Sequence, residues 1–348
     1  LLLYLEPVEE AETTTSTSGD IYRGSENRKE KTYYTTERKE WEAKDLFASP
    51  VKIEREEPNV LVLDMPRYCF DGKTLEGPEE ILRADNRLRT LLHLPLRRAA
   101  LAQPWTQKKE EKPYKIMLQY EIFCQDAVKD IQLGLEALEE SRIWLDKEEI
   151  SKKETGYFVD PCIHTIALPD LKEGLHELKL EVAFTGKVNL ESMYLLGDFL
   201  VQVTGSCAVL EKERENFFWG SLTEQGMSFY GGNAVYKTEV ELESGSYVLE
   251  VSKFRAPLLK VRVDGKEAGE IFKAPYRVAF ETKQPGQHLI EIVSYGNRVN
   301  TFGAIHDCDE QEIYFDPNAW RTTLDSWSYE YQLKKTGILK APVLWKQK

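Results

Sequence analysis

One layout of strands and turns occurs twice in this chain, in residues 143–180 and again in residues 261–292, about 118 residues later. In each copy, apolar residues alternate on both sides of a tight turn at Asp146 or Asp264. A loop, a glycine turn and a further alternating strand follow. A unit of this size used twice indicates a duplicated domain, because solenoid repeats have periods of about 20–50 residues. Two related β-sandwiches are the simplest fold that fits this pattern.

The domain organisation follows from changes in composition along the 348 residues. Residues 1–58 are mostly polar, and we expect a connector or the end of a preceding domain, anchored by Trp41, Leu46 and Phe47. Leu1 to Leu5 look like a strand of that preceding domain. Residues 59–210 are expected to form the first sandwich, with a helical insertion at about 78–102, where leucines share one helix face. Residues 211–348 are expected to form the second sandwich. The expected fold class is all-β, with a jelly-roll sandwich in each domain and a minor helical part.

Charge and cysteine content exclude several classes of partner. The net charge is −13, with 59 acidic against 46 basic residues, so nucleic acid and anionic membrane surfaces are not expected as partners. The five cysteines are scattered without metal-ligand spacing, which predicts neither a disulfide scaffold nor a zinc site. No apolar run is long enough for a membrane span or a signal peptide. We therefore expect a cytoplasmic protein, with secretion as the alternative if a leader precedes Leu1.

Four stretches of the chain carry a resemblance to a known family: residues 59–64, 189–199, 263–292 and 331–343. They resemble the galactose-binding-like β-sandwich modules of large glycoside hydrolases, in particular of family 2 enzymes and the related α-L-rhamnosidase-like enzymes. The first stretch is similar to the strand that follows the catalytic barrel. The others are similar to the turns and closing strands of two modules. The resemblance implies two galactose-binding-like jelly-roll sandwiches at the C-terminal end of such an enzyme.

The same resemblance implies an accessory role. These enzymes carry their catalytic residues on a (β/α)₈ barrel, and this sequence has no run of βα units that could form one. No catalytic residue is therefore expected here, and no cofactor is required. The expected partners are a glycan or oligosaccharide and the missing N-terminal catalytic domain. Two alternatives stay open: a glycosidase with a site between the sandwiches that uses His306 and Asp307, or purely structural interaction modules.

Aromatic, amide and acidic residues gather near the C-terminal third of the chain, where sandwich loops meet at one rim. Aromatic rings can stack on the apolar face of a sugar while polar groups bind its hydroxyls. The competing interpretation is that these residues form the core or anchor neighbouring domains, since tryptophan is seldom exposed. The candidate carbohydrate-binding residues are Trp219, Tyr230, Asn300, His306, Asp307, Trp320, Arg321 and Trp327.

The acidic residues of the same loop raise the question of a metal. Asp307 and Asp309 offer hard oxygen ligands of the kind that Ca²⁺ prefers, although no calcium-loop signature surrounds them. The competing interpretation is a solvated acidic loop that packs on its neighbour. Calcium therefore stays a candidate ligand at this stage.

Overall fold

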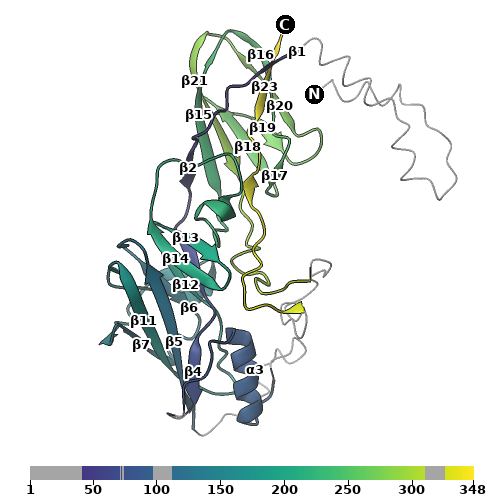
Figure 1. Ribbon diagram of the computed structural model, residues 1–348. Coiled ribbons are helices and arrows are strands. Elements are labelled where there is room, and N and C mark those ends of the chain that lie inside the picture. The colour runs from purple at the N-terminus through teal and green to yellow at the C-terminus, as the bar shows by residue number, and fades with distance from the viewer. Residues whose placement is uncertain (1–40, 71, 73, 97–111, 310–325) are drawn as a thin grey trace, which may run out of the picture.

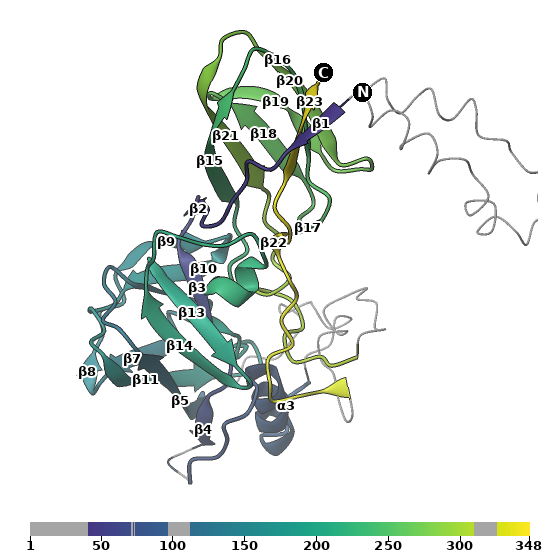
Figure 2. The ribbon, with the colours of Figure 1, turned by 45° about the horizontal axis from the view of Figure 1, so that its top comes forward.

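The computed structural model describes residues 41–70, 72, 74–96, 112–309 and 326–348. These residues form two β-sandwiches that lie one above the other (Figures 1 and 2). The all-β prediction is confirmed, because the described elements are strands apart from one α-helix and one 3₁₀ turn. Residues 1–40, with the expected end of a preceding domain, lie outside the described part.

The first sandwich encloses one hydrophobic core between two sheets. The central strand β5 shows why its residues form a strand: Ile116, Leu118, Tyr120 and Ile122 alternate with more exposed residues and all point into the core. One sheet has the order β3 (Asn59–Leu63), β12 (Met193–Gly197), β6 (Gln132–Leu135), β10 (Asp160–Ala167) and β9 (Glu154–Phe158). The other has the order β13 (Phe199–Thr204), β14 (Cys207–Lys212), β5 (Tyr114–Cys124), β11 (Gly174–Phe184), β7 (Ser141–Leu145) and β8 (Glu148–Glu149), with β4 (Arg67–Phe70) also paired to β5.

The expected helical insertion contains α3 (Ile81–Leu91), which covers one end of the first sandwich (Figure 1). Glu80 is its N-cap, and its carboxylate accepts hydrogen bonds from the backbone N–H groups of Leu82 and Arg83. Ile81 and Leu88 lie on the buried face, which joins the helix to the core. The part of the insertion from residue 97 on lies outside the described residues. Neither α3 nor any other helix among those residues has the length and apolar character needed to cross a membrane.

The second sandwich has its own core and a more complex path of the chain. A 3₁₀ turn, η5 (Leu222–Gln225), and a short ribbon of β17 (Phe254–Arg255) and β22 (Gly337–Ile338) lie at its lower end. One sheet has the order β1 (Trp41–Lys44), β23 (Val343–Gln347), β16 (Gly245–Glu250) and β20 (Arg277–Thr282). The other has the order β19 (Lys266–Ile271), β18 (Leu259–Val263), β21 (Gly286–Ser294), β15 (Ala234–Leu242) and β2 (Lys52–Arg55).

Strands β1 and β2 correct the expected connector. Residues 41–58 were assigned to a polar linker, but β1 pairs with β23 and β2 pairs with β15 of the second sandwich. Both are short edge strands with few buried residues, so their sequences look polar. Phe47, one of the expected anchors, is 2% exposed and lies in the second core. The second sandwich therefore contains residues from both sides of the first.

The duplication is visible in the strand order of both domains. The order β5-β11-β7-β8 in the first sandwich matches β15-β21-β18-β19 in the second. Both turn aspartates adopt a left-handed backbone conformation, with φ of 49° at Asp146 and 51° at Asp264. In both, the carboxylate accepts a hydrogen bond of 2.9 Å from the backbone N–H of the strand opposite.

A histidine completes the same arrangement in each copy. Nδ1 of His176 lies 2.5 Å from the carboxylate of Asp146, and Nδ1 of His288 lies 2.7 Å from that of Asp264. The Nε2 atom of each ring faces a backbone carbonyl oxygen. Because both ring nitrogens face acceptors, the doubly protonated imidazolium fits best. Burial opposes that charge at His176, but the hydrogen bond to the aspartate outweighs it, and the pKa of both histidines is raised.

The two turns differ at the second turn position, which gives a first prediction. Lys147 adopts φ of 78° where the other copy has Gly265 at 73°. A side chain in this region costs roughly 1 kcal/mol, which glycine avoids. We expect Lys147→Gly to raise the free energy of unfolding by up to about 1 kcal/mol, and Gly265→Lys to lower it by a similar amount. Urea denaturation measures both, and changes of the same sign in the two variants would contradict the equivalence of the turns.

Candidate functional site

The described polar candidates lie in a loop that joins the two sandwiches. This junction loop, residues 295–309 and 326–336, leaves β21 and returns through β22, and it runs down beside the first sandwich toward α3 (Figure 1). Ile305 is buried in the first core, and Tyr331 and Leu333 pack against it. Leu200 of β13 in turn lies in the second core. The junction loop thus packs into the first core, and a residue of the first sandwich packs into the second core.

His306 lies at the centre of this junction and is 5% exposed. Its Nδ1 donates to the backbone oxygen of Ser328 at 2.9 Å, and its Nε2 donates to the carboxylate of Asp64 at 3.1 Å. Its ring lies 4.9 Å from that of Tyr331, centroid to centroid. The hydroxyl of Tyr331 donates to the other carboxylate oxygen of Asp64 at 2.8 Å. We call Asp64, His306 and Tyr331 the junction triad.

The protonation state of His306 follows from these contacts. Burial opposes a charged ring, but the hydrogen bond to Asp64 and the negative charges of Asp64 and Glu80 outweigh it, so the pKa of His306 is raised. Both ring nitrogens face oxygen acceptors, which agrees with an imidazolium. The junction triad therefore holds a buried ion pair that bridges the two domains.

Asp64 connects four segments of the chain. It follows the buried strand β3, and its backbone oxygen accepts the N–H of Ile81 at the start of α3 at 2.8 Å. Its side chain binds the junction loop through His306 and Tyr331. Our sequence analysis missed Asp64. The available signal was an aspartate directly after the apolar run of residues 60–63.

Glu80 lies beside the triad and is the second residue that sequence reasoning missed. Burial, helped by the negative charge of Asp64, raises the pKa of its carboxyl to about 7, although its helix-capping hydrogen bonds oppose the shift. A neutral carboxyl near pH 7 is a feature of some general acids. Here the carboxylate is also a helix cap, so its position is explained by structure.

Glu80 gives a prediction of pH dependence. A carboxyl whose pKa is higher in the folded state binds more protons when folded, so its contribution to stability falls as the pH rises from about 4.5 to about 7. We expect the free energy of unfolding of Glu80→Gln, measured relative to the unmodified chain, to increase as the pH rises through this range. Above it, the difference should stay constant. Urea denaturation at several pH values measures the difference. A difference that stays constant from pH 4.5 to 7 would contradict the assignment.

Asn300 and Tyr230 are structural in this arrangement. The amide of Asn300 donates to the backbone oxygens of Ser228 and Lys334 and accepts the N–H of Lys334 at 2.8 Å. Tyr230 is buried, and its hydroxyl donates to the backbone oxygen of Asn233 at 2.6 Å. Both side chains therefore fasten the junction loop and its neighbours.

The glycine that follows Tyr230 allows a close approach of two backbones. A Cβ atom at Gly231 would lie 2.6 Å from the side chain of Arg298 and 3.0 Å from the backbone oxygen of Asn297. The neighbours are residues of the junction loop.

The two described tryptophans among the candidates also pack against protein groups. The ring of Trp219 stacks on Tyr236 at 5.3 Å with an interplanar angle of 10°, and it lies edge-on to Phe47. The ring of Trp327 lies 4.2 Å from the guanidinium of Arg83 on α3 and stacks on His306. Their flat faces are thus used by protein contacts. Trp320 and Arg321, the remaining candidates, lie outside the described residues.

In the described part, Asp307 and Asp309 do not form a metal-binding cluster with other side chains. Asp307 is 2% exposed, and its carboxylate accepts the backbone N–H of Asp309 at 2.8 Å. Among the described residues, no group of three or more histidine, cysteine or acidic side chains could hold a metal ion. This geometry explains Asp307 as part of a loop turn that faces Trp327 across an isolated β-bridge.

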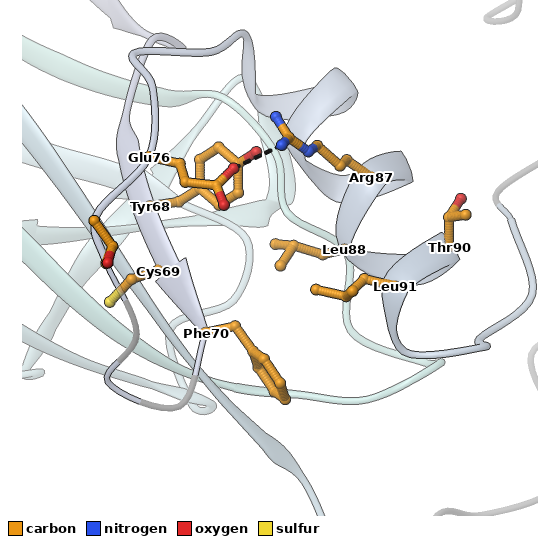
Figure 3. A pocket seen from close by; sticks show the side chains of 9 residues that line it. Tyr68, Cys69, Phe70, Glu76, Arg87, Leu88, Thr90 and Leu91 are labelled. Carbon is orange, nitrogen blue, oxygen red and sulfur yellow. Dashed lines mark ion pairs between the residues drawn. The ribbon is translucent and has the colours of Figure 1, made fainter.

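Two clefts lie elsewhere on the molecule. One, with a volume of about 420 Å³, lies between β4 and α3 and is mainly apolar (Figure 3). The other, of about 910 Å³, is an open and charged groove at the waist between the sandwiches. In this groove Arg55 of the second sandwich bridges Asp198 and Glu213 of the first. The waist groove is therefore lined by ion pairs that connect the domains.

Comparisons with known proteins gave matches only among solved structures. No protein-family profile matches the chain, and no curated protein matches it. Similar structures include a rhamnosidase from Novosphingobium sp. PP1Y (16% identity, TM-score 0.28). They also include a GH2 β-galacturonidase from Eisenbergiella tayi (8%, 0.26) and a β-D-mannosidase from Dictyoglomus thermophilum (14%, 0.25). The matches cover 68%, 69% and 69% of this chain but only 23%, 37% and 31% of those longer chains, respectively.

Proposed function

We propose that this chain is a non-catalytic accessory region of a larger glycoside hydrolase. In this proposal, two galactose-binding-like sandwiches form one rigid body that supports a catalytic barrel. The resemblance of residues 59–64, 189–199, 263–292 and 331–343 to such modules supports the family. The junction triad supports the rigid, structural role.

The single observation that carries the proposal is the burial of the triad. His306 and Asp64 are 5% and 2% exposed, and their polar atoms already bind each other, Ser328 and Tyr331. A buried histidine–carboxylate pair at a domain boundary fixes the relative position of the domains, because separating them would leave a charge without its partner. The residues with the best chemistry for a reaction are thus used to hold the sandwiches together.

This arrangement does not favour a glycosidase site between the sandwiches. Such a site needs two carboxyl groups across a cleft, about 5–5.5 Å apart in retaining enzymes or 6.5–9.5 Å apart in inverting ones, with access for sugar and water. Asp307, the acidic residue first considered for this role, is 2% exposed. Asp64 accepts two hydrogen bonds, and Glu80 accepts two from its own helix. Neither carboxylate faces a described cleft.

The test is an activity assay on the intact chain. We expect no turnover of a panel of aryl α-rhamnosides, β-galactosides, β-glucuronides and β-mannosides. Asp64→Asn and Asp307→Ala are measured in parallel, with circular dichroism as the check that each variant is folded. Turnover by the unmodified chain that disappears in a folded Asp64→Asn or Asp307→Ala variant would overturn the proposal.

A further inference from the structure

We propose that the cleft between β4 and α3 is a binding site for one neutral sugar ring. Its volume of about 420 Å³ falls in the range of small-molecule sites, about 300–1,000 Å³. The site lies in the first sandwich, away from the junction triad, and it does not depend on the accessory role proposed above. The side chains that carry the argument are Tyr68, Phe70, Glu76, Arg87, Leu88 and Leu91.

The floor and one wall of the cleft are apolar. Phe70 comes from the end of β4, and Leu88 and Leu91 point from α3 toward this strand (Figure 3). Leu88 is buried, whereas Leu91 at the last turn of the helix is 57% exposed. Such a surface suits the C–H face of a pyranose, which is the apolar side of an otherwise polar ring.

Tyr68 supplies a buried hydroxyl whose proton has no acceptor. Its side chain is 4% exposed, and no described residue meets the geometry of a hydrogen bond with its hydroxyl. The guanidinium of Arg87 interacts with the hydroxyl oxygen, but it can only donate. Burial raises the pKa of Tyr68, although the charge of Arg87 opposes the shift, so the hydroxyl keeps its proton and can donate. In Figure 3 it points toward Arg87 and Glu76. A buried hydroxyl proton without an acceptor is destabilising, and an acceptor on a ligand would remove this cost.

Glu76 and Arg87 supply both kinds of hydrogen-bonding group at the mouth. They form an ion pair of 2.8 Å, and each side chain is more than half exposed. An exposed pair of this kind contributes little to stability, so a ligand can replace it at low cost. The guanidinium can donate to sugar hydroxyl oxygens, while the carboxylate can accept from sugar hydroxyl hydrogens.

The charge balance decides the class of ligand. An anion would meet the carboxylate of Glu76 as well as Arg87, so a net negative ligand is disfavoured. A wholly apolar ligand would cover Tyr68 and the ion pair without satisfying them, which is costly. A neutral ring with one apolar face and several hydroxyls satisfies both the floor and the polar groups.

The experiment uses the intact chain and small defined probes. Methyl glycosides of galactose, glucose, mannose and rhamnose are the neutral probes, glucuronate is the anionic probe, and phenol is the apolar probe. Binding is measured by ligand-observed NMR titration. We expect at least one methyl glycoside to bind more tightly than either glucuronate or phenol. Tyr68→Phe should weaken it about three- to tenfold, the effect of one hydrogen bond, and Arg87→Ala at least about tenfold.

Tyr120→Phe is the matched control. Tyr120 is also a buried tyrosine of the first sandwich whose hydroxyl forms no hydrogen bond in the described part, but it does not line this cleft. We expect the Tyr120→Phe variant to bind the glycoside as tightly as the unmodified chain does. The proposal is overturned if no methyl glycoside binds at tens of millimolar, if glucuronate or phenol binds better, or if Tyr68→Phe and Tyr120→Phe bind equally well.

Discussion

Replacing Arg89 by methionine is expected to lower the free energy of unfolding of the first sandwich by about 3–5 kcal/mol, the range for breaking a buried ion pair from one side. Arg89 is 1% exposed, and its guanidinium lies 2.6 Å from the carboxylate of Asp85 one turn earlier in α3. Without the arginine, that carboxylate keeps a negative charge inside the core. The same carboxylate also accepts the N–H of Leu190, so it cannot turn toward water without losing this bond.

Arg89 also binds the segment that follows β11. It donates to the backbone oxygens of Pro95, Gly186 and Val188. For this reason we expect the double replacement of Arg89 by methionine and Asp85 by leucine to remain destabilised, although paired apolar replacements elsewhere are often neutral. The three backbone oxygens would still lose the hydrogen bonds that Arg89 donates.

Arg87→Met is the control for Arg89→Met. Arg87 lies on the same helix, but its pair with Glu76 is exposed, so the loss should be at most about 1 kcal/mol. Guanidinium denaturation of the three variants at one pH measures the differences. Equal losses for Arg87→Met and Arg89→Met would contradict the assignment of a buried pair.

Replacing Asp64 by alanine is expected to have the second largest effect, a loss of about 3 kcal/mol. The change leaves two buried donors, His306 and Tyr331, without their acceptor, and each unsatisfied group costs about 1–3 kcal/mol. Because these donors belong to the junction loop, the two sandwiches should also become less coupled. A single unfolding transition in the unmodified chain should therefore separate into two in Asp64→Ala.

The effect of Asp64→Ala should depend on pH. The pKa of His306 is raised in the folded chain, so its stabilising contribution is fully present below about 6.5 and is lost as the pH rises through the raised value. The cost of Asp64→Ala should thus be larger at pH 6 than at pH 9. His164→Ala is the control, because His164 is only partly buried and lies 3.4 Å from Glu154 at the surface. A cost that is small, or equal at both pH values, would contradict the ion pair.

The sequence predicted those parts of the fold that depend on neighbouring residues. The alternation in β5 and the paired turns at Asp146 and Asp264 are local patterns, and all three are present in the structure. Strand β2 could not be recognised, because only Ile53 of its four residues is buried and its partner β15 begins at Ala234. An edge strand is defined by its partner more than by its own composition.

The candidate site shows the same limit. His306 was selected because it lies in a polar loop, which is correct, but its role depends on Asp64, 242 residues earlier in the chain. Trp327 likewise contacts Arg83, which lies far earlier in the chain. No local pattern indicates such pairs. Sequence reasoning placed His306 and Trp327 in this loop, and their described contacts are with other protein groups.

The path of the chain determines the order in which the two sandwiches can fold. The strands of the first sandwich come from one continuous stretch, from β3 to β14, although Phe229 and Ile305 complete its core. The second sandwich includes β1 and β2, which precede this stretch. It also includes β23, which pairs with β1 although the two strands lie at opposite ends of the described chain. During synthesis the first sandwich can therefore fold before the strands that pair with β1 and β2 have been made. Because contacts of such long sequence separation form slowly, Phe47 and Ile53 remain exposed to aggregation and to chaperones until the strands of the second core have been synthesised.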